Sequence, residues 1–450
     1  MDDFAPKAIE HFNKAAKSLV TCIVPFNPPQ PEFAPSKSMS SSYKDIQIID
    51  LSKMGARLQN LRIEFADKLD QIYKSTDRGW IGIDKNSIAD FSKLVRSILT
   101  KVDWIDYPTL ESIVFEWIVN EHLEQDQEDL ITYLDSWKKE HVRVYEIFFL
   151  IKNLAIETPF QLGRAFVTFY TEEGLDSLFD SLKYKINRHR KKLIKSKFVG
   201  SVVVACRTSN GEINLAKEVA FEECALSVDA LKLFSVVIED PNRYVTFDLD
   251  SRTLDVIYEQ DILAVEVHQD RQLMRLNYSF TRPRPSQFTI DNDYMRTMSG
   301  KGIGYIHNFL VGERKSELSQ LIIQSIKYFA SALSQRDLHK RIVDVFTVME
   351  SLVLRNDDEG ILHSLTTYVP KILTKDIEDR KNIANMIKRM YKVRSSVVHH
   401  GKKSTFETQD LVMLQRCVRN LIVNFAEFSQ SHTRKDTILK DIDDAIHKAY

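Results

Sequence analysis

The spacing of apolar residues changes twice along this chain of 450 residues. From about Ile46 to Leu193 apolar residues recur at helical spacing, which predicts amphipathic helices. From Phe198 to Phe280 the sequence turns to alternation between turn residues, as in YVTFDLD, and this predicts β-strands. Helical spacing returns from Lys315 onward. The order predicts a multidomain, mainly α protein with a small central α+β domain of antiparallel strands.

The length also predicts more than one domain, because a single hydrophobic core rarely extends over more than about 300 residues. A stretch rich in proline and serine, Asn27 to Ser42, is predicted to be a loop or arm. We therefore expect an N-terminal arm or linker at 1–45, a helical domain at 46–197, an α+β domain at 198–290, a linker at 291–314 and an all-α helical bundle at 315–450.

The central domain is predicted to be a β-meander interrupted by one helix, at about Leu215–Phe234. The segment SGKGIG at Ser299–Gly304 carries closely spaced glycines, but it lacks the G-x-x-x-x-G-K-[ST] spacing of a phosphate-binding loop. We interpret it as part of the linker. In the last third, helices are expected at Lys315–Leu333, Asp337–Leu354, Gly360–Leu373, Asp376–His400, Phe406–Phe428 and Lys435–Tyr450.

Composition excludes several classes of protein. The 62 lysines and arginines almost cancel the 63 aspartates and glutamates, so any affinity for nucleic acid must come from a local patch. The four cysteines lie far apart without a C-x-x-C pair, which argues against a disulfide framework and against a thiolate zinc site. The start of the chain lacks the features of a signal peptide, and no apolar run approaches the roughly 18 residues of a membrane span. We expect a cytoplasmic protein that does not bind membranes.

One local patch is basic. Between Lys183 and Lys197, eight of fifteen residues are lysine or arginine. Such density suits a phosphate backbone, and the candidates for RNA binding are Arg188, Arg190, Lys191 and Lys192. The alternative is a helix end that simply faces water, as charge runs usually do.

The stretch MYKVRSSVVHHG, Met390 to Gly401, places two histidines in the last turn of a predicted helix. The unpaired carbonyls there favour a cation, so His399 and His400 are suited to exchange protons near neutrality. Arg394 lies about 7.5 Å along the axis and roughly 140° around it from His399. The two can share one phosphate only if the last turn is distorted or if two such helices pack together. Otherwise the three residues would serve only as partners of the helix end.

The wider segment carries a resemblance. It runs from VDVFTVMESLVL at Val343–Leu354 to RKNIANMIKRMYKVRSSVVHHG at Arg380–Gly401, and it resembles the HEPN superfamily, in particular the Apea-like HEPN domains. The similarity covers about Lys315–Ser429. The family's R-x(4-6)-H motif falls on Arg394 with His399, or with His400 as the alternative. The family's other typical positions fall on Glu350, Tyr391 and Ser395.

The resemblance implies a metal-independent RNA endonuclease without cofactor, active as a homodimer through the HEPN domain, in antiviral defence or a toxin system. Histidine would then act on the ribose 2′-hydroxyl and the leaving oxygen, and arginine on the phosphorane. Glu350 is expected to be half-buried beside Arg394, as an orienting partner or as a purely structural ion pair. The first 300 residues are expected to sense an unknown phage-derived or cellular trigger, or to restrain the nuclease.

Two alternatives stay open. A HEPN domain can be a non-catalytic module that dimerises or binds a nucleotide or a partner protein. A toxin silenced by adenylylation would carry a tyrosine two residues after the histidine, where this chain has Gly401, and this alternative is disfavoured.

Overall fold

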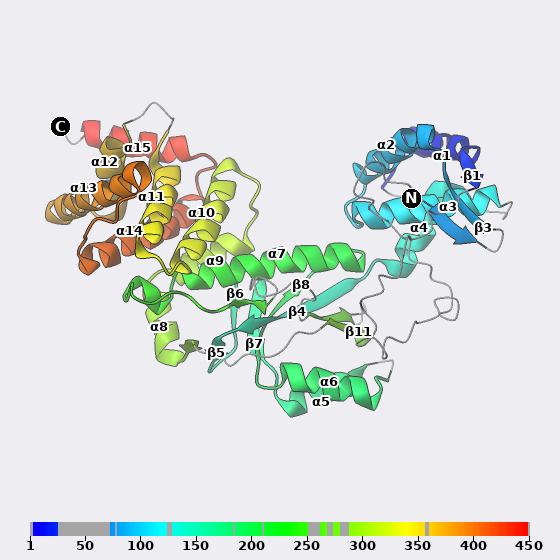
Figure 1. Cartoon of the computed structure of the whole chain (residues 1–450), viewed down its shortest axis with the longest axis horizontal. Coiled ribbons are helices and arrows are strands. Elements are labelled where there is room, and N and C mark those ends of the chain that lie inside the picture. Colours follow the sequence, from blue (N-terminus) through cyan, green and yellow to red (C-terminus); the bar gives the residue numbers. More distant parts are fainter. Residues whose placement is uncertain are drawn as a thin grey trace, which may run out of the picture. The chain divides into compact units, whose positions relative to one another are not determined.

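A computed structural model describes residues 3–25, 73–76, 79–123, 128–182, 185–208, 211–250, 262–267, 273–279, 288–355 and 360–448 (Figure 1). The chain forms two compact units. The first comprises Met1–Arg143 with Asn210–Leu215, and the second comprises Val144–Ser209 with Ala216–Tyr450. The predicted proline-rich loop at 27–42 and the first part of the predicted helical pattern, residues 46–72, lie outside the described residues.

The first unit is a small helical body with one short sheet. Its helices are α1 (Pro6–Val20), α2 (Ile88–Leu99), α3 (Tyr107–His122) and α4 (Leu130–His141). The strands β1 (Ile23–Pro25), β3 (Gly79–Ile83) and β2 (Tyr73–Thr76) pair antiparallel in that order. The prediction of an arm over residues 1–45 was wrong at α1, because Phe12, Ala16 and Leu19 form a buried apolar face on this helix.

The second unit contains a sheet in the order β11-β10-β4-β8-β7-β6, with β9 also paired to β4. Every pair is antiparallel, as predicted for the central strands. The strands are β4 (Val144–Lys152), β6 (Phe160–Leu162), β7 (Ala165–Phe169), β8 (Val202–Arg207), β9 (Asp248–Leu249), β10 (Ile262–Val267) and β11 (Leu273–Ser279). A separate parallel pair joins β5 (Leu154–Ile156) to β12 (Phe288–Ile290).

This sheet corrects two predictions. Strands β4 to β7 lie within 46–197, the region predicted to be wholly helical. The predicted meander was also wrong, because β8 pairs with the earlier strands β4 and β7 and not with the strands that follow it. Among the described strands after Phe198 in this sheet, β10 and β11 pair as chain neighbours. The strand expected at LDVIYEQ, residues 254–260, lies outside the described residues.

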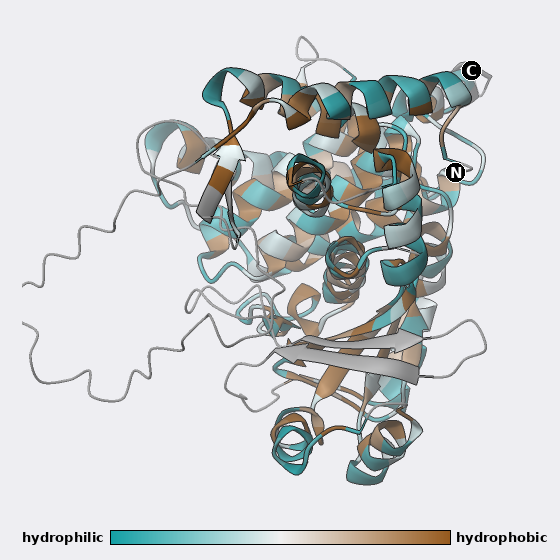
Figure 2. Cartoon of the chain, turned by 90° about the vertical axis from the view of Figure 1, so that its right-hand side faces the viewer, coloured by the Kyte–Doolittle hydropathy of each residue, from teal (hydrophilic) through white to brown (hydrophobic). Residues whose placement is uncertain are grey.

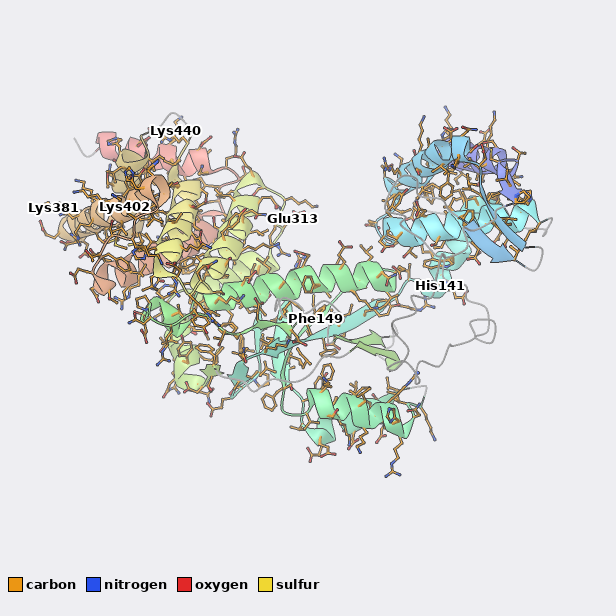
Figure 3. All side chains as sticks on the ribbon, in the orientation of Figure 1. His141, Phe149, Glu313, Lys381, Lys402 and Lys440 are labelled. Carbon is orange, nitrogen blue, oxygen red and sulfur yellow. The ribbon has the colours of Figure 1, made fainter. Side chains whose placement is uncertain are left out.

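Helices cover both faces of the sheet (Figure 1). On one face α5 (Glu172–Ser181) and α6 (Arg188–Phe198) pack against alternate residues of β4, including Phe148 and Leu150. On the other face Phe149 meets Phe221 of α7 (Ile213–Lys232) with ring centroids 5.7 Å apart (Figure 3). The predicted helix at Leu215–Phe234 is therefore confirmed as α7.

Two helices occupy the predicted linker at 291–314, and that prediction was wrong. They are α8 (Asn292–Gly300) and α9 (Ile303–Val311), and their buried side chains include Met298 and Phe309. Gly302 joins them with φ 91°, and a Cβ there would lie 2.6 Å from Val423 Cγ1. This glycine of the SGKGIG segment serves a tight helix–helix turn.

The C-terminal third is a helical bundle. It consists of α10 (Glu317–Leu333), α11 (Leu338–Val353), α12 (Ile361–Leu373), α13 (Ile377–His400), α14 (Thr408–Phe428) and α15 (Lys435–Lys448). These match the six predicted helices closely. Figure 2 shows hydrophobic and hydrophilic residues alternating along the helices, as amphipathic segments require. The mainly α character expected from the sequence is confirmed.

The segment that follows α7 is fixed to the bundle by polar contacts, one of them from a buried arginine. Arg341 of α11 is 1% exposed and donates to the carbonyls of Pro241 and Arg243, each at 2.8 Å. Burial lowers the pKa of Arg341 to about 10. Glu239 pairs with Lys301 at 2.9 Å and with Arg416 of α14. These contacts tie the sheet region and the bundle into one unit.

Candidate active site at the end of helix α13

Helix α13 carries the residues singled out in the sequence. Its N-cap Asp376 accepts a hydrogen bond from the Asp379 amide at 2.8 Å. Its C-cap Gly401 adopts φ 62°, and the Gly401 amide donates to the Val397 carbonyl at 3.0 Å. A Cβ at this position would meet no atom within 4 Å, so steric crowding does not explain the glycine. The left-handed backbone conformation is what favours glycine here. The structure thus ends the helix where the sequence predicted.

The last turn of α13 is regular, because the helix continues without interruption to His400. Arg394 and His399 therefore keep the separation of roughly 140° that ideal geometry gives. The side chain of Arg394 is only 15% exposed, whereas His399 and His400 are both exposed. A distorted last turn is excluded as a way to bring Arg394 and His399 together on one phosphate. Within one chain these groups face different directions.

Arg394 is held by Glu350 of α11. Its Nη2 lies 3.2 Å from Glu350 Oε1 and 3.3 Å from Glu350 Oε2. Both side chains are 15% exposed. The structure thus places Glu350 half-buried beside Arg394, as the sequence predicted. The partnership explains how a carboxylate is tolerated on an otherwise apolar part of α11.

Burial and the Arg394 charge act on the pKa of Glu350 in opposite directions, and burial has the larger effect. Burial raises the pKa of Glu350, and the nearby Arg394 guanidinium offsets only part of that rise. Among the described residues, Arg394 Nε has no hydrogen-bond acceptor although it is buried. Glu350 therefore orients the guanidinium through Nη2 and leaves the buried Nε without an acceptor in the described part of the chain.

Tyr391 supports the same arginine from its own helix. Its ring centroid lies 5.5 Å from Arg394 Cζ, a distance suited to a cation–π contact. Phe346 of α11 meets the Tyr391 ring almost edge-on, with centroids 5.7 Å apart. Ser395, the next candidate, is partly exposed. Of the predicted supporting residues, Glu350 and Tyr391 contact Arg394, while His400 lies with His399 at the helix end.

A second set of residues, which sequence reasoning missed, fixes the loop after α13. Lys403 pairs with Asp337 at 2.7 Å, and His339 Nε2 lies 2.9 Å from the Ser404 carbonyl oxygen. The His339 ring also packs on Phe406, with centroids 5.4 Å apart. The only signal in the sequence was Asp337 as an N-cap residue, and this gives no indication of its distant partner. The loop beside the two histidines is thus anchored to the start of α11.

The anchor predicts a pH dependence. The hydrogen bond from Lys403 lowers the pKa of Asp337 to about 2, below the ordinary value of 3.8. Because the folded-state pKa is depressed, the contribution of the Asp337 charge to stability is present above pH 3.8 and is lost as the pH falls toward 2. We expect Asp337→Asn, which keeps an N-cap side chain, to be less stable than wild type at neutral pH. The difference should fall by more than half in this acid range.

Denaturant unfolding of both proteins at a series of pH values measures that difference. A constant difference down to the acid end would mean that the lost hydrogen bond, and not the charge, sets the effect.

The basic stretch on α6 stands apart from this site. Arg188, Arg190 and Lys192 are exposed, whereas Lys191 pairs with Asp180 of α5 at 3.5 Å. Lys195 pairs with Glu172 and Asp176 of α5, so acidic partners neutralise part of this surface. Helix α6 covers the sheet and α13 belongs to the bundle, and the structure does not bring them together (Figure 1). RNA binding by α6 stays a prediction.

No family model, no curated protein and no solved structure matches this chain. The HEPN resemblance therefore rests on the residues of α11 to α13. Within the described ranges, no group of three or more His, Cys, Asp or Glu is placed to hold a metal ion. None of the described helices combines the length and the apolar character that a membrane crossing demands.

Proposed function

We propose that this protein is a metal-independent RNA endonuclease of the HEPN type, and a defence or toxin effector controlled by the regions before the bundle. One observation carries the proposal. Arg394 is held by a half-buried carboxylate and an aromatic ring, one and a half turns before two exposed histidines at a glycine-capped helix end. An oriented guanidinium and accessible imidazoles are the groups that phosphodiester cleavage requires.

The chemistry follows from these groups. An imidazole takes the proton of the ribose 2′-hydroxyl, and the 2′-oxygen attacks phosphorus as the P–O5′ bond breaks. A second, protonated imidazole gives its proton to the leaving 5′-oxygen. The products are a 2′,3′-cyclic phosphate and a 5′-hydroxyl, so atoms and charge balance. The Arg394 guanidinium stabilises the negative charge on the phosphorane.

The proposal requires a homodimer. Arg394 and His399 point away from each other on one helix, so the α13 ends of two copies must face each other for the groups to meet. Val398 is 49% exposed and follows Arg394 by four residues, so the two lie on the same side of α13. An exposed valine at this position suits contact with a second copy.

The end groups of the products test the reaction. We expect the purified full-length chain to cleave single-stranded RNA in the presence of EDTA and to leave 2′,3′-cyclic phosphate ends. DNA of the same sequence should stay intact, because it lacks the attacking hydroxyl. Parallel assays of His399→Ala and His400→Ala show which of these imidazoles the reaction requires. Cleavage of DNA, or 3′-hydroxyl products from RNA, would exclude this mechanism.

A non-catalytic HEPN module is the alternative, acting in dimerisation or in binding of a nucleotide or partner. The ion pair between Arg394 and Glu350 is also compatible with this alternative, because a purely structural ion pair would have the same geometry in one chain. A dimer that leaves every RNA intact would support this alternative.

A further inference from the structure

Helix α13 presents a polar stripe to solvent that ends at His399. Lys388, Lys392, Ser395 and His399 follow one another at intervals of four, three and four residues, which places them within about 60° of each other around the axis. The buried residues Met386, Met390 and Val393 lie on the opposite side. Lys388, Lys392 and His399 are exposed, and Ser395 is partly exposed. We call these four residues the α13 stripe.

The two lysines of the α13 stripe differ from the other cations of this helix. Four of its six lysines and arginines have partners within the protein: Arg380 donates to the Thr374 carbonyl, Lys381 pairs with Glu378, Arg389 with Asp410 and Arg394 with Glu350. Lys388 and Lys392 make no ion pair or side-chain hydrogen bond with any described residue. Two cations without a partner among the described residues therefore lie one turn apart on the line that leads to His399.

No acidic residue of the helix balances this charge. From Arg380 to His400 the sequence contains no aspartate or glutamate, and the acids of α13 are confined to its first turn. The carboxyl end of a helix carries partial negative charge, which repels a phosphate within the last turn. Lysines about two and three turns earlier on the same face can offset that repulsion for an anion that approaches His399.

We propose that the α13 stripe binds the sugar–phosphate backbone of single-stranded RNA and leads the strand to His399, an inference that rests on the proposed nuclease function. Lys388 and Lys392 are about 6 Å apart along the axis, and His399 follows about 10.5 Å further on. Lysines contact phosphates as point charges, and the Ser395 hydroxyl adds a donor between them and His399. Such contacts position a strand without reading its bases, so we expect little sequence preference from this surface.

Binding measured without cleavage tests the α13 stripe directly. In the full chain carrying His399→Ala, we expect Lys388→Gln with Lys392→Gln to weaken binding of a labelled single-stranded RNA about tenfold, because two phosphate contacts are lost. The slope of log affinity against log salt should become shallower by about 1.4, at 0.7 for each lost contact. Fluorescence anisotropy over a salt series gives both quantities.

The matched control is Lys440→Gln on α15, which removes an exposed lysine of the same bundle (Figure 3). This change should leave the affinity and the salt slope unaltered. An equal loss from Lys440→Gln would reduce the effect to net charge and overturn the proposal, and so would an unaltered affinity in the double variant.

The two hypotheses fail separately. If wild type cleaves RNA but the double lysine variant cleaves with unchanged KM, the stripe is only a solvated helix face and the nuclease stands. If the lysines govern binding but wild type leaves RNA intact, the stripe stands and the nuclease proposal falls.

Discussion

Replacement of Glu350 by methionine is expected to lower the free energy of unfolding by about 3 kcal/mol. The change keeps the volume of the side chain but leaves the Arg394 guanidinium, only 15% exposed, without its carboxylate. Arginine keeps its charge at any ordinary pH, so it cannot escape by losing a proton. Denaturant unfolding measures the loss, which should not shrink as the pH falls from 7 to 5, because the raised pKa of Glu350 stabilises only the wild type in that direction.

Arg394→Met should be less harmful, with a loss on the order of 1–2 kcal/mol at pH 7. Burial already raises the pKa of Glu350, and without Arg394 the carboxyl can take up a proton and become neutral. A group whose pKa is raised on folding contributes stability that is lost as the pH rises through the folded value. The deficit of Arg394→Met should therefore shrink as the pH falls from 7 to 5, unlike that of Glu350→Met.

Lys381→Met on the same helix provides the control. Lys381 pairs with Glu378 at 2.7 Å, but these side chains are 63% and 73% exposed, so the change should alter stability by less than about 0.5 kcal/mol. The double variant Glu350→Met with Arg394→Met should be more stable than the sum of the two single losses predicts. Additive losses would show that the two side chains do not interact energetically.

The C-terminal bundle could be predicted from sequence because its helices are amphipathic. Apolar residues such as Met386, Met390 and Val393 recur at helical spacing, and Gly401 ends the helix. Glu350 of α11 and Arg394 of α13 were singled out by the resemblance, and helical spacing added that Glu350 lies beside an apolar face and needs a partner. Helical periodicity thus predicted the fold of this region, and the resemblance supplied the two residues of the contact.

Strands β4 to β7 could not be predicted in the same way, because the sheet is covered on both faces. Strand β8 lies in the region predicted to form strands, although every residue from Val202 to Cys206 is buried and the strand lacks the alternation of a half-exposed strand. Strand β4 similarly reads VYEIFFLIK, an apolar run that short-range periodicity does not separate from a buried helix. Its β-branched and aromatic residues were the available signal.

Contacts between segments that are distant in the sequence could not be predicted from sequence patterns either. Asp337 and Lys403 are 66 residues apart, and their pairing depends on the antiparallel return of α13 toward the start of α11. Cys206 and Cys224 lie far apart in the sequence, yet β8 and α7 bring them close enough for their thiols to hydrogen-bond. Only the packing of helices and strands determines such pairs.

Loss of either central group should abolish most of the proposed activity. We expect Arg394→Gln and His399→Ala each to reduce the rate of RNA cleavage about 100-fold or more, through lost charge stabilisation and lost proton transfer respectively. Glutamine at position 394 retains a donor toward Glu350, which protects the fold. Thermal unfolding of both variants checks that they stay folded. A folded variant with wild-type activity would remove that residue from the site.

Mixing the two variants then tests whether the site is shared between chains. Arg394 and His399 face different directions on a regular helix, so each site should combine the arginine of one copy with the histidine of the other. In a heterodimer of Arg394→Gln with His399→Ala, one site regains both groups and the other lacks both. Half of the dimers are mixed after random exchange, so activity should return to about a quarter of wild type. If both groups of a site came from one chain, no mixed dimer would contain an intact pair and the mixture would stay inactive.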